Sequence, residues 1–133
     1  MLGFALCMRR SRRSSPMGKT SRNKGGRGER EACTEMERIT GIPWRRSVAQ
    51  TQRGGQVPDI VPVDESHPLN GLHVEVKRNE SLSPWAALEQ AEQDSKKSGG
   101  VPVVLMRKNR KPWTFLVRAN HLPALMALVR GER

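Results

Sequence analysis

The sequence has few aromatic residues, few cysteines and no long hydrophobic run. Only 4% of its 133 residues are aromatic, and none is tyrosine, so the chain supports one domain with a modest core. Two cysteines, Cys7 and Cys33, form neither a disulfide framework nor a zinc site, which fits a reducing cytoplasm. No stretch has the length of a membrane span. The apolar opening before Met8 precedes its basic residues, the reverse of a signal peptide.

Several chemical signatures are also missing. The three histidines, His67, His73 and His121, are too scattered to suggest a zinc site or a nucleophile and base pair. The chain has no Gly-rich phosphate loop of the Walker type and no serine or cysteine in a nucleophile signature. The sequence therefore gives no indication of zinc binding, of a Walker-type phosphate site or of catalysis by a serine or cysteine nucleophile.

Acidic residues are in the minority. The 24 Lys and Arg exceed the 13 Asp and Glu, which gives a formal charge of +11 and predicts a polyanionic partner, most commonly nucleic acid. Seven of the basic residues and no acid lie in residues 1–26. We predict a disordered basic tail there and a single domain over 27–133. The tail is either an arm that binds phosphates or a solvated segment before the true start, because Met8 and Met17 offer alternative starts.

Apolar patterning predicts alternating helices and strands from residue 29 onward. Helical spacing of apolar residues and their flanking caps predict helices over 29–40, 84–97 and 120–129. Short β-branched or apolar runs predict strands over 44–52, 59–63, 72–77, 101–106 and 113–117. The run 101–106 is apolar throughout, so we expect it to be central or nearly so and covered on both faces. Ser83 is the expected N-cap of the second helix, with Pro84 at its first position.

The same spacing predicts which helical side chains are buried. We expect core faces made of Ala32, Cys33, Met36 and Ile39 in the first helix, Trp85, Leu88 and Ala91 in the second, and Leu122, Leu125, Met126 and Val129 in the third. For the third helix, a dimer contact is the alternative use of this stripe.

The candidate catalytic residues lie on two of the predicted strands. Asp59 begins one strand, while Glu75 and Lys77 lie two apart in the next, so Glu75 and Lys77 share a face and Val74 and Val76 face the core. If these strands are neighbours joined by the loop 64–70, Asp59 approaches Glu75 and the pair can hold a divalent cation. Such oxygen ligands suit Mg²⁺ or Mn²⁺.

Three further residues have two interpretations each. Glu29 projects from the core-facing side of its helix, either as a third carboxylate at the metal site or as a complement to the helix N-terminal dipole. Asp64 in the connecting loop is a rival metal ligand to Asp59, which we prefer because it starts the strand. Gln90 is either a polar auxiliary of the site or a surface glutamine.

Basic residues surround the predicted strands and loops. Arg53 adjoins the Gly54-Gly55 loop, and a basic turn from Arg107 to Lys111 precedes the last strand. Such side chains contact phosphates or remain solvated. The candidate DNA-binding residues are Arg45, Arg46, Arg53, Arg78, Arg107, Lys108 and Arg110.

The motifs, taken in order, resemble a known nuclease superfamily. The helix opening Gly28-Glu29-Arg30-Glu31, the Gly54-Gly55 loop, Pro58-Asp59-Ile60 and Glu75-Val76-Lys77 together resemble the PD-(D/E)XK nucleases, and most closely the archaeal Holliday junction resolvases and their phage-borne relatives. The likeness covers roughly residues 24–118.

The resemblance implies a restriction-endonuclease-like α/β fold, with a mixed sheet flanked by helices, and a homodimer that cleaves DNA with Mg²⁺ or Mn²⁺ as cofactor. Asp59, Glu75, the Val76 carbonyl and Glu29 would hold the metal, and Lys77 would be the motif lysine. A lysine this close to carboxylates stays protonated, which favours an electrostatic role over that of a general base. The expected partner is DNA, most typically a four-way junction, in the cytoplasm of a bacterium or a phage-infected cell, with no membrane partner.

Two other functions fit parts of the sequence. A repair or restriction-type nuclease acting on duplex, nicked or single-stranded DNA would use the same residues, because the fold hosts many substrates. A non-enzymatic basic DNA-binding protein would explain the charge, but it would leave Glu29, Asp59 and Glu75 repelling phosphate to no purpose.

Overall fold

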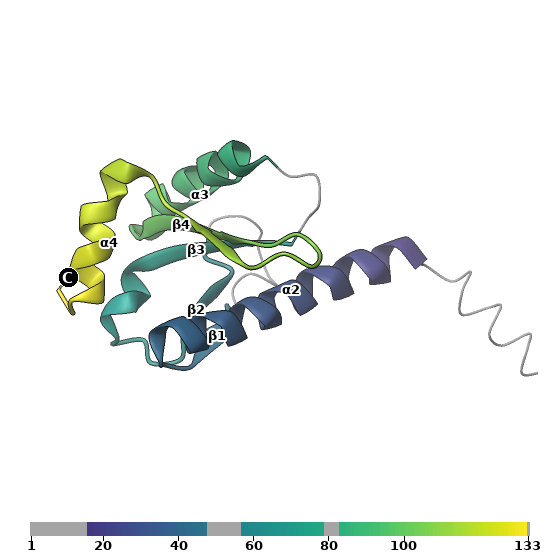
Figure 1. Ribbon diagram of the computed structural model, residues 1–133, viewed down its shortest axis with the longest axis horizontal. Helices are drawn as coiled ribbons and strands as arrows, with labels where there is room; N and C mark the ends of the chain where they lie inside the picture. The colour runs from purple at the N-terminus through teal and green to yellow at the C-terminus, as the bar shows by residue number, and fades with distance from the viewer. Residues whose placement is uncertain (1–15, 48–56, 79–82, 133) are drawn as a thin grey trace, which may run out of the picture.

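Five strands form one mixed sheet, and helices cover both of its sides (Figure 1). The computed structural model describes residues 16–47, 57–78 and 83–132. In chain order the elements are α2 (Pro16–Thr40), β1 (Trp44–Arg46), β2 (Ile60–Pro62), η2 (Pro68–Gly71), β3 (Leu72–Lys77), α3 (Pro84–Ser98), β4 (Val101–Met106), β5 (Thr114–Leu116), η3 (Ala119–His121) and α4 (Leu122–Val129). This architecture confirms the predicted α/β domain with a mixed sheet of five strands.

The sheet order follows the chain order, β1-β2-β3-β4-β5. The β3–β4 pair is parallel, and the other three pairs are antiparallel. A parallel pair needs a long crossover, which α3 supplies. The ends of α3 are as predicted, because the Ser83 side chain accepts a hydrogen bond from the Ala86 N–H and Gly99 adopts the left-handed conformation with φ 77°. Both caps fix where α3 begins and ends relative to β3.

The two central strands, β3 and β4, present different residues to the two sides of the sheet. Val74, Val103 and Leu105 belong to the larger core, which also contains Ala32 and Met36 of α2. The alternate residues of β4, Val104 and Met106, pack instead with Ala87, Leu88 and Ala91 of α3. The prediction that residues 101–106 form a strand covered on both faces is therefore confirmed, and α2 and α3 lie on opposite sides of the sheet (Figure 1).

The first helix is longer than the sequence suggested. It begins at Pro16 rather than at Glu29, so it extends into the segment for which the sequence predicted a basic tail. Proline is favoured in a first helical turn, and each residue added to an existing helix gains a hydrogen bond at little further cost. No proline interrupts residues 17–40. The rest of the predicted tail, residues 1–15, lies outside the described part of the chain.

Several side chains expected in the core are exposed. Ile39, Trp85, Leu122, Met126 and Val129 are exposed, and Trp85 reaches 65%. Leu125 is partly buried, and Leu128 is the residue of α4 that enters the core. Helical periodicity identifies an apolar stripe but does not say which part of it another element will cover. The apolar stripe on α4 is therefore mainly exposed, as its alternative interpretation as a dimer contact requires.

Three of the strands are shorter than predicted. β1 ends at Arg46, β2 spans Ile60–Pro62 and β5 spans Thr114–Leu116, because each extends only as far as its neighbour provides a hydrogen-bonded partner. The rest of the strand predicted to end at Gln52, from residue 48 onward, lies outside the described residues. The last predicted helix, over 120–129, is divided into η3 and α4.

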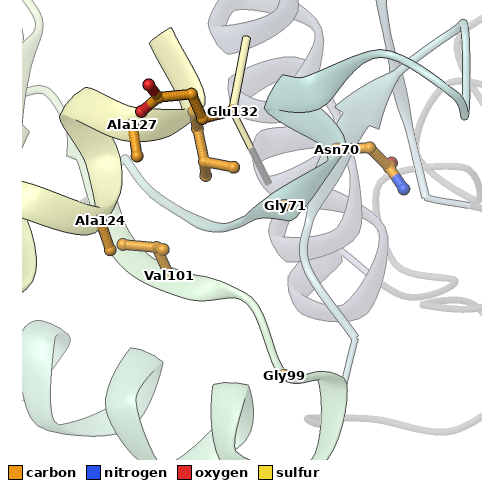
Figure 2. A pocket seen from close by; sticks show the side chains of 8 residues that line it. Asn70, Gly71, Gly99, Val101, Ala124, Ala127 and Glu132 are labelled. Carbon is orange, nitrogen blue, oxygen red and sulfur yellow. The ribbon is translucent and has the colours of Figure 1, made fainter. Parts of the chain in front are cut away.

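A pocket of about 390 Å³ lies where η2 and the start of β4 meet α4 (Figure 2). Ala124 and Ala127 of α4 line it together with Val101. Gly71 allows close packing of Leu128 here, because a Cβ at this position would lie 2.9 Å from Cδ2 of Leu128. None of the predicted site residues lines this pocket. Among the described residues, no helix has the length and apolar character to cross a membrane.

Candidate active site

Asp59 is held between β1 and β3 by its own backbone. Its N–H donates to the Val74 carbonyl at 2.8 Å, and its carbonyl accepts from the Ser47 N–H at 3.0 Å. The side chain turns toward β3, where Oδ2 accepts from the Val76 N–H at 2.7 Å. The predicted approach of Asp59 to the Glu75-Val76-Lys77 strand is therefore confirmed.

Three acids act on one another at this point. The pKa of Asp59 is raised to about 8, chiefly by burial and then by the negative charges of Glu75 and Glu29, and the hydrogen bond from Val76 opposes this rise. Desolvation and like charge both favour the protonated acid. The shift thus reports carboxylates that converge in a buried place, which is typical of functional sites.

Glu75 is buried in the middle of β3, with only 4% of its surface exposed. The alternation of the strand turns Val74 into the larger core and sends His73 and Glu75 to the other side, toward α3. Nε2 of His73 lies 3.0 Å from Oε1 of Glu75. His73 did not enter the predicted site, although its position two residues before Glu75 places it on the same face of the strand.

Lys77 points along the same face as Glu75, as predicted, and it meets α3. Its Nζ donates to Oε1 of Gln90 at 2.9 Å. Of the two interpretations of Gln90, contact with the site is the one that the structure supports. This contact fixes the position of a long flexible side chain beside the acids.

Glu29 lies in the middle of α2, because this helix begins at Pro16. A role at the helix N-terminus is therefore excluded, since the dipole acts only within the first turn. Oε1 of Glu29 forms an ion pair with Nη2 of Arg46 at 3.2 Å, and its charge acts on Asp59. Glu29 is thus near the acids, as the sequence interpretation required.

Asp64, the rival ligand, closes a turn. Its Oδ1 accepts from the Ser66 N–H at 3.0 Å and from the Ser66 hydroxyl at 2.6 Å. The side chain is exposed in the loop after β2. This local pattern is the ordinary use of an aspartate in a turn, and it supports Asp59 as the strand acid.

Most of the candidate DNA-binding arginines are held by acids in this structure. Arg78 and Arg107 both pair with Oε2 of Glu31, at 3.2 and 3.6 Å. Arg46 pairs with Glu29 and Arg45 with Glu65. Lys108 and Arg110 are exposed in the β4–β5 turn, and Arg53 lies outside the described residues. Gly28 permits the close approach of α2, because a Cβ there would lie 2.9 Å from Cβ of Arg78.

Asp94 of α3 is an acid that the sequence interpretation did not place in the site. One ligand atom each from His73, Glu75 and Asp94 lies within 4.8 Å of the other two. Burial and the charge of Glu75 raise the pKa of Asp94. The available signal was its spacing, because Asp94 follows Gln90 by one helical turn and so extends the same face toward β3.

The donor set at Asp59 and Glu75 fits a hard divalent cation. Carboxylate oxygens and the nearby backbone carbonyl of Val76 are ligands that such ions prefer, and the repulsion evident in the raised pKa of Asp59 would be relieved by a bound ion. Two converging acids and a lysine on neighbouring strands of a mixed sheet are the features of a nuclease of the PD-(D/E)XK class.

Comparison with known proteins identifies the family. Residues 20–128 match the family model described as "Phage putative PDDEXK endonuclease". The chain therefore belongs to this family of phage PD-(D/E)XK endonucleases, which use divalent metal ions.

A solved structure of Hjc, a Holliday junction resolvase from the archaeal hyperthermophile Archaeoglobus fulgidus, is similar over 68% of this chain and 73% of that chain, with 26% identity and a TM-score of 0.48. No curated protein sequence matches the chain.

Proposed function

We propose that this endonuclease hydrolyses DNA phosphodiester bonds with Mg²⁺, or with Mn²⁺ in its place, and that it acts on four-way junctions as a homodimer. The observation that supports the cleavage chemistry is the convergence of Asp59 on Glu75 across β2 and β3, with the pKa of Asp59 raised to about 8. The preference for junctions follows the sequence motifs that resemble the resolvases. The site of action is the cytoplasm of a bacterium or a phage-infected cell.

In this proposal four groups hold the metal: the carboxylates of Asp59, Glu75 and Glu29 and the carbonyl of Val76. A bound divalent ion would lower the pKa of a coordinated water and stabilise negative charge on the phosphate. The Val76 N–H keeps Oδ2 of Asp59 in place. This hydrogen bond joins β2 to β3, so the two acids keep their spacing while substrate enters.

Lys77 acts on the reacting phosphate through its charge. Because Nζ donates to Gln90, the ammonium group is held rather than free to move, and its remaining protons can orient the attacking water. A fixed positive charge next to the scissile group stabilises the charge that develops in the transition state. Gln90 is accordingly a positioning residue for Lys77.

Phosphate groups of DNA would compete for the arginines that acids now hold. Glu31 brings Arg78 and Arg107 together from β3 and the β4–β5 turn, and Arg46 is close to the acids through Glu29. A phosphate offers these side chains a stronger bidentate partner than a single shared carboxylate oxygen. Together with Arg45, Arg53, Lys108 and Arg110, they would form the DNA-binding surface.

Exposed apolar residues on α4 support the homodimer. Leu122, Met126 and Val129 are each at least 43% exposed on one short helix, and such residues gathered together favour association. Two identical sites related by a two-fold axis would cut opposed strands symmetrically.

The test is cleavage of four end-labelled DNA substrates: a four-way junction, a linear duplex, a flap and a single strand. Each is incubated with Mg²⁺ and with EDTA. Paired symmetric nicks near the crossover, present with Mg²⁺ and abolished by EDTA, are expected. Asp59→Asn should remove cleavage while DNA binding remains, and Glu89→Gln, an exposed change on α3, serves as the matched control. Equal cutting of the linear duplex would reject the junction preference, and binding without cleavage on any substrate would reject the nuclease.

A further inference from the structure

A second cluster of ligand atoms lies beneath α3, on the side of Glu75 that faces His73. His73 is fully buried, and Glu75 is 4% exposed. Asp94 completes the group, with all three ligand atoms within 4.8 Å of one another. The cluster contains none of the other proposed ligands of the catalytic centre, which are Asp59, Glu29 and Val76. The cluster therefore overlaps the catalytic centre only at Glu75.

Both ring nitrogens of His73 have a polar partner. Nδ1 of His73 lies 2.8 Å from the Ser98 hydroxyl, which also lies 3.3 Å from the Ser95 carbonyl. A proton on Nδ1 leaves a lone pair on Nε2 that can bind a metal ion. Nε2 faces Oε1 of Glu75 at 3.0 Å. A shared proton or a metal ion can link two such atoms at this distance.

Asp94 contributes a buried carboxylate oxygen to the cluster. Its Oδ2 is buried and has no hydrogen-bond partner among the described residues, which is costly for a carboxylate oxygen. The cationic side chain that faces the cluster from the sheet is Lys77, and its Nζ is directed at Gln90. The charges of His73 and Lys77 lower the pKa of Asp94 and so oppose the effects of burial and Glu75.

We propose that His73, Glu75 and Asp94 bind a second divalent cation, of the borderline class that includes Mn²⁺, Co²⁺ and Zn²⁺. An imidazole ligand favours these ions over Mg²⁺. Two ligands that lie about 2.1 Å from one ion at a right angle are about 3.0 Å apart, which is the separation of Nε2 and Oε1 here. Ser98 orients the imidazole from behind, as the outer partner of a metal-bound histidine does.

This inference rests on the proposed function only through the shared residue Glu75. The ion would neutralise the buried acids and hold Glu75 from one side while its other oxygen serves the catalytic centre. The cluster would therefore couple the position of α3, through Asp94, to the catalytic carboxylate on β3.

The test uses the full chain carrying Asp59→Asn, which removes one acid of the catalytic centre and leaves the cluster intact. Mn²⁺ is added to the metal-free protein, its binding is followed by equilibrium titration, and pulsed electron paramagnetic resonance detects coupling to a ¹⁴N nucleus. We expect nitrogen coupling from His73. A further Asp94→Asn change should weaken Mn²⁺ binding at least about 10-fold with nitrogen coupling retained, whereas Glu89→Gln should not change it.

His73→Gln should abolish the nitrogen coupling, and circular dichroism reports whether this variant folds. If it does not fold, the comparison of Asp94→Asn with Glu89→Gln still decides the question. Absence of nitrogen coupling in the Asp59→Asn chain, or equal Mn²⁺ affinity in the Asp94→Asn and Glu89→Gln variants, would overturn the inference and assign the position to a proton.

Cleavage by the unmodified chain is measured separately. Cleavage without nitrogen coupling rejects the second site alone, and nitrogen coupling without cleavage supports the second site while rejecting the nuclease proposal.

Discussion

The two sides of the sheet are built from the same strands, yet they differ in what they bury. The side facing α2 is apolar and contains Val74, Val103 and Leu105. The side facing α3 has a smaller apolar core around Leu88 and buries His73 and Glu75 in its remaining area. Period-two alternation allows one strand to serve both purposes at once.

This difference shows how a chain with a modest core accommodates a charged site. Burying Glu75 is costly unless it has partners, and the α3 side supplies them through His73 at 3.0 Å and the positioned Lys77. The α2 side provides the packing that keeps β3 in place. Changes on the two sides should therefore separate stability from catalysis.

The largest effect is expected from Lys77→Ala on the α3 side. Loss of the fixed ammonium group should lower the cleavage rate by about 10²–10³-fold, as does removal of other preorganised groups that stabilise transition-state charge, while the melting temperature changes little. Single-turnover cleavage and thermal denaturation measure the two quantities. Lys96→Ala, an exposed change on α3, is the matched control, and an active Lys77→Ala enzyme would contradict the assigned role.

On the α2 side, Leu105→Ala should mainly reduce stability. Leu105 is 1% exposed, and its truncation leaves a cavity that costs about 2–5 kcal/mol of unfolding free energy. The folded fraction should retain its cleavage rate. Leu88→Ala, on the buried face of α3, should lower both stability and the cleavage rate, because α3 also carries Gln90. Urea denaturation and cleavage assays compare the two, and identical behaviour would remove the distinction between the sides.

The metal-free protein should lose stability as the pH rises from about 4 to about 8. Asp59 has its pKa raised from 3.8 to about 8, so the folded state keeps a proton that the unfolded state releases across this window. The Asp59→Asn variant should show a flatter profile. Melting temperatures in EDTA at pH 5 and pH 8 test this, and a steeper decline in the variant would contradict it.

Gln90→Ala should have an intermediate effect on catalysis. Its amide oxygen holds Nζ of Lys77 at 2.9 Å, so its loss releases the ammonium group without removing it and should lower the rate by about 10-fold. Gln90→Glu, which keeps an acceptor at this position, should restore part of the rate. The cleavage rate at saturating Mg²⁺ is the measurement, and an unchanged Gln90→Ala rate would make Gln90 a surface residue.

The smallest effect is expected from Trp85→Ala. The ring is 65% exposed, with Arg118 over it at 5.4 Å from its centroid. An exposed side chain of this kind contributes within about 0.5 kcal/mol to stability. Thermal denaturation measures the change, and a loss comparable to that of Leu88→Ala would place Trp85 in the core, as the sequence had suggested.

Local chemistry made part of this structure predictable. Ser83 and Gly99 end α3 as expected, because caps depend on the backbone within a few residues. The bounds of β3 are those predicted, and Glu75 and Lys77 share a face because alternation is a property of any strand. The exposure of Ile39 and Trp85 was not predictable, because it depends on which elements pack nearby.

The sequence by itself determined the candidate chemistry: an acid at the start of one strand, an acid and a lysine two apart on the next, and the glutamine on the following helix. Tertiary structure decided which acids meet. The β2–β3 pairing brought Asp59 to Val76, and the crossover helix α3 brought Asp94 to His73 and Glu75. Spacing along one element fixes the face on which a residue lies, whereas the distance between elements depends on the packing of the whole chain.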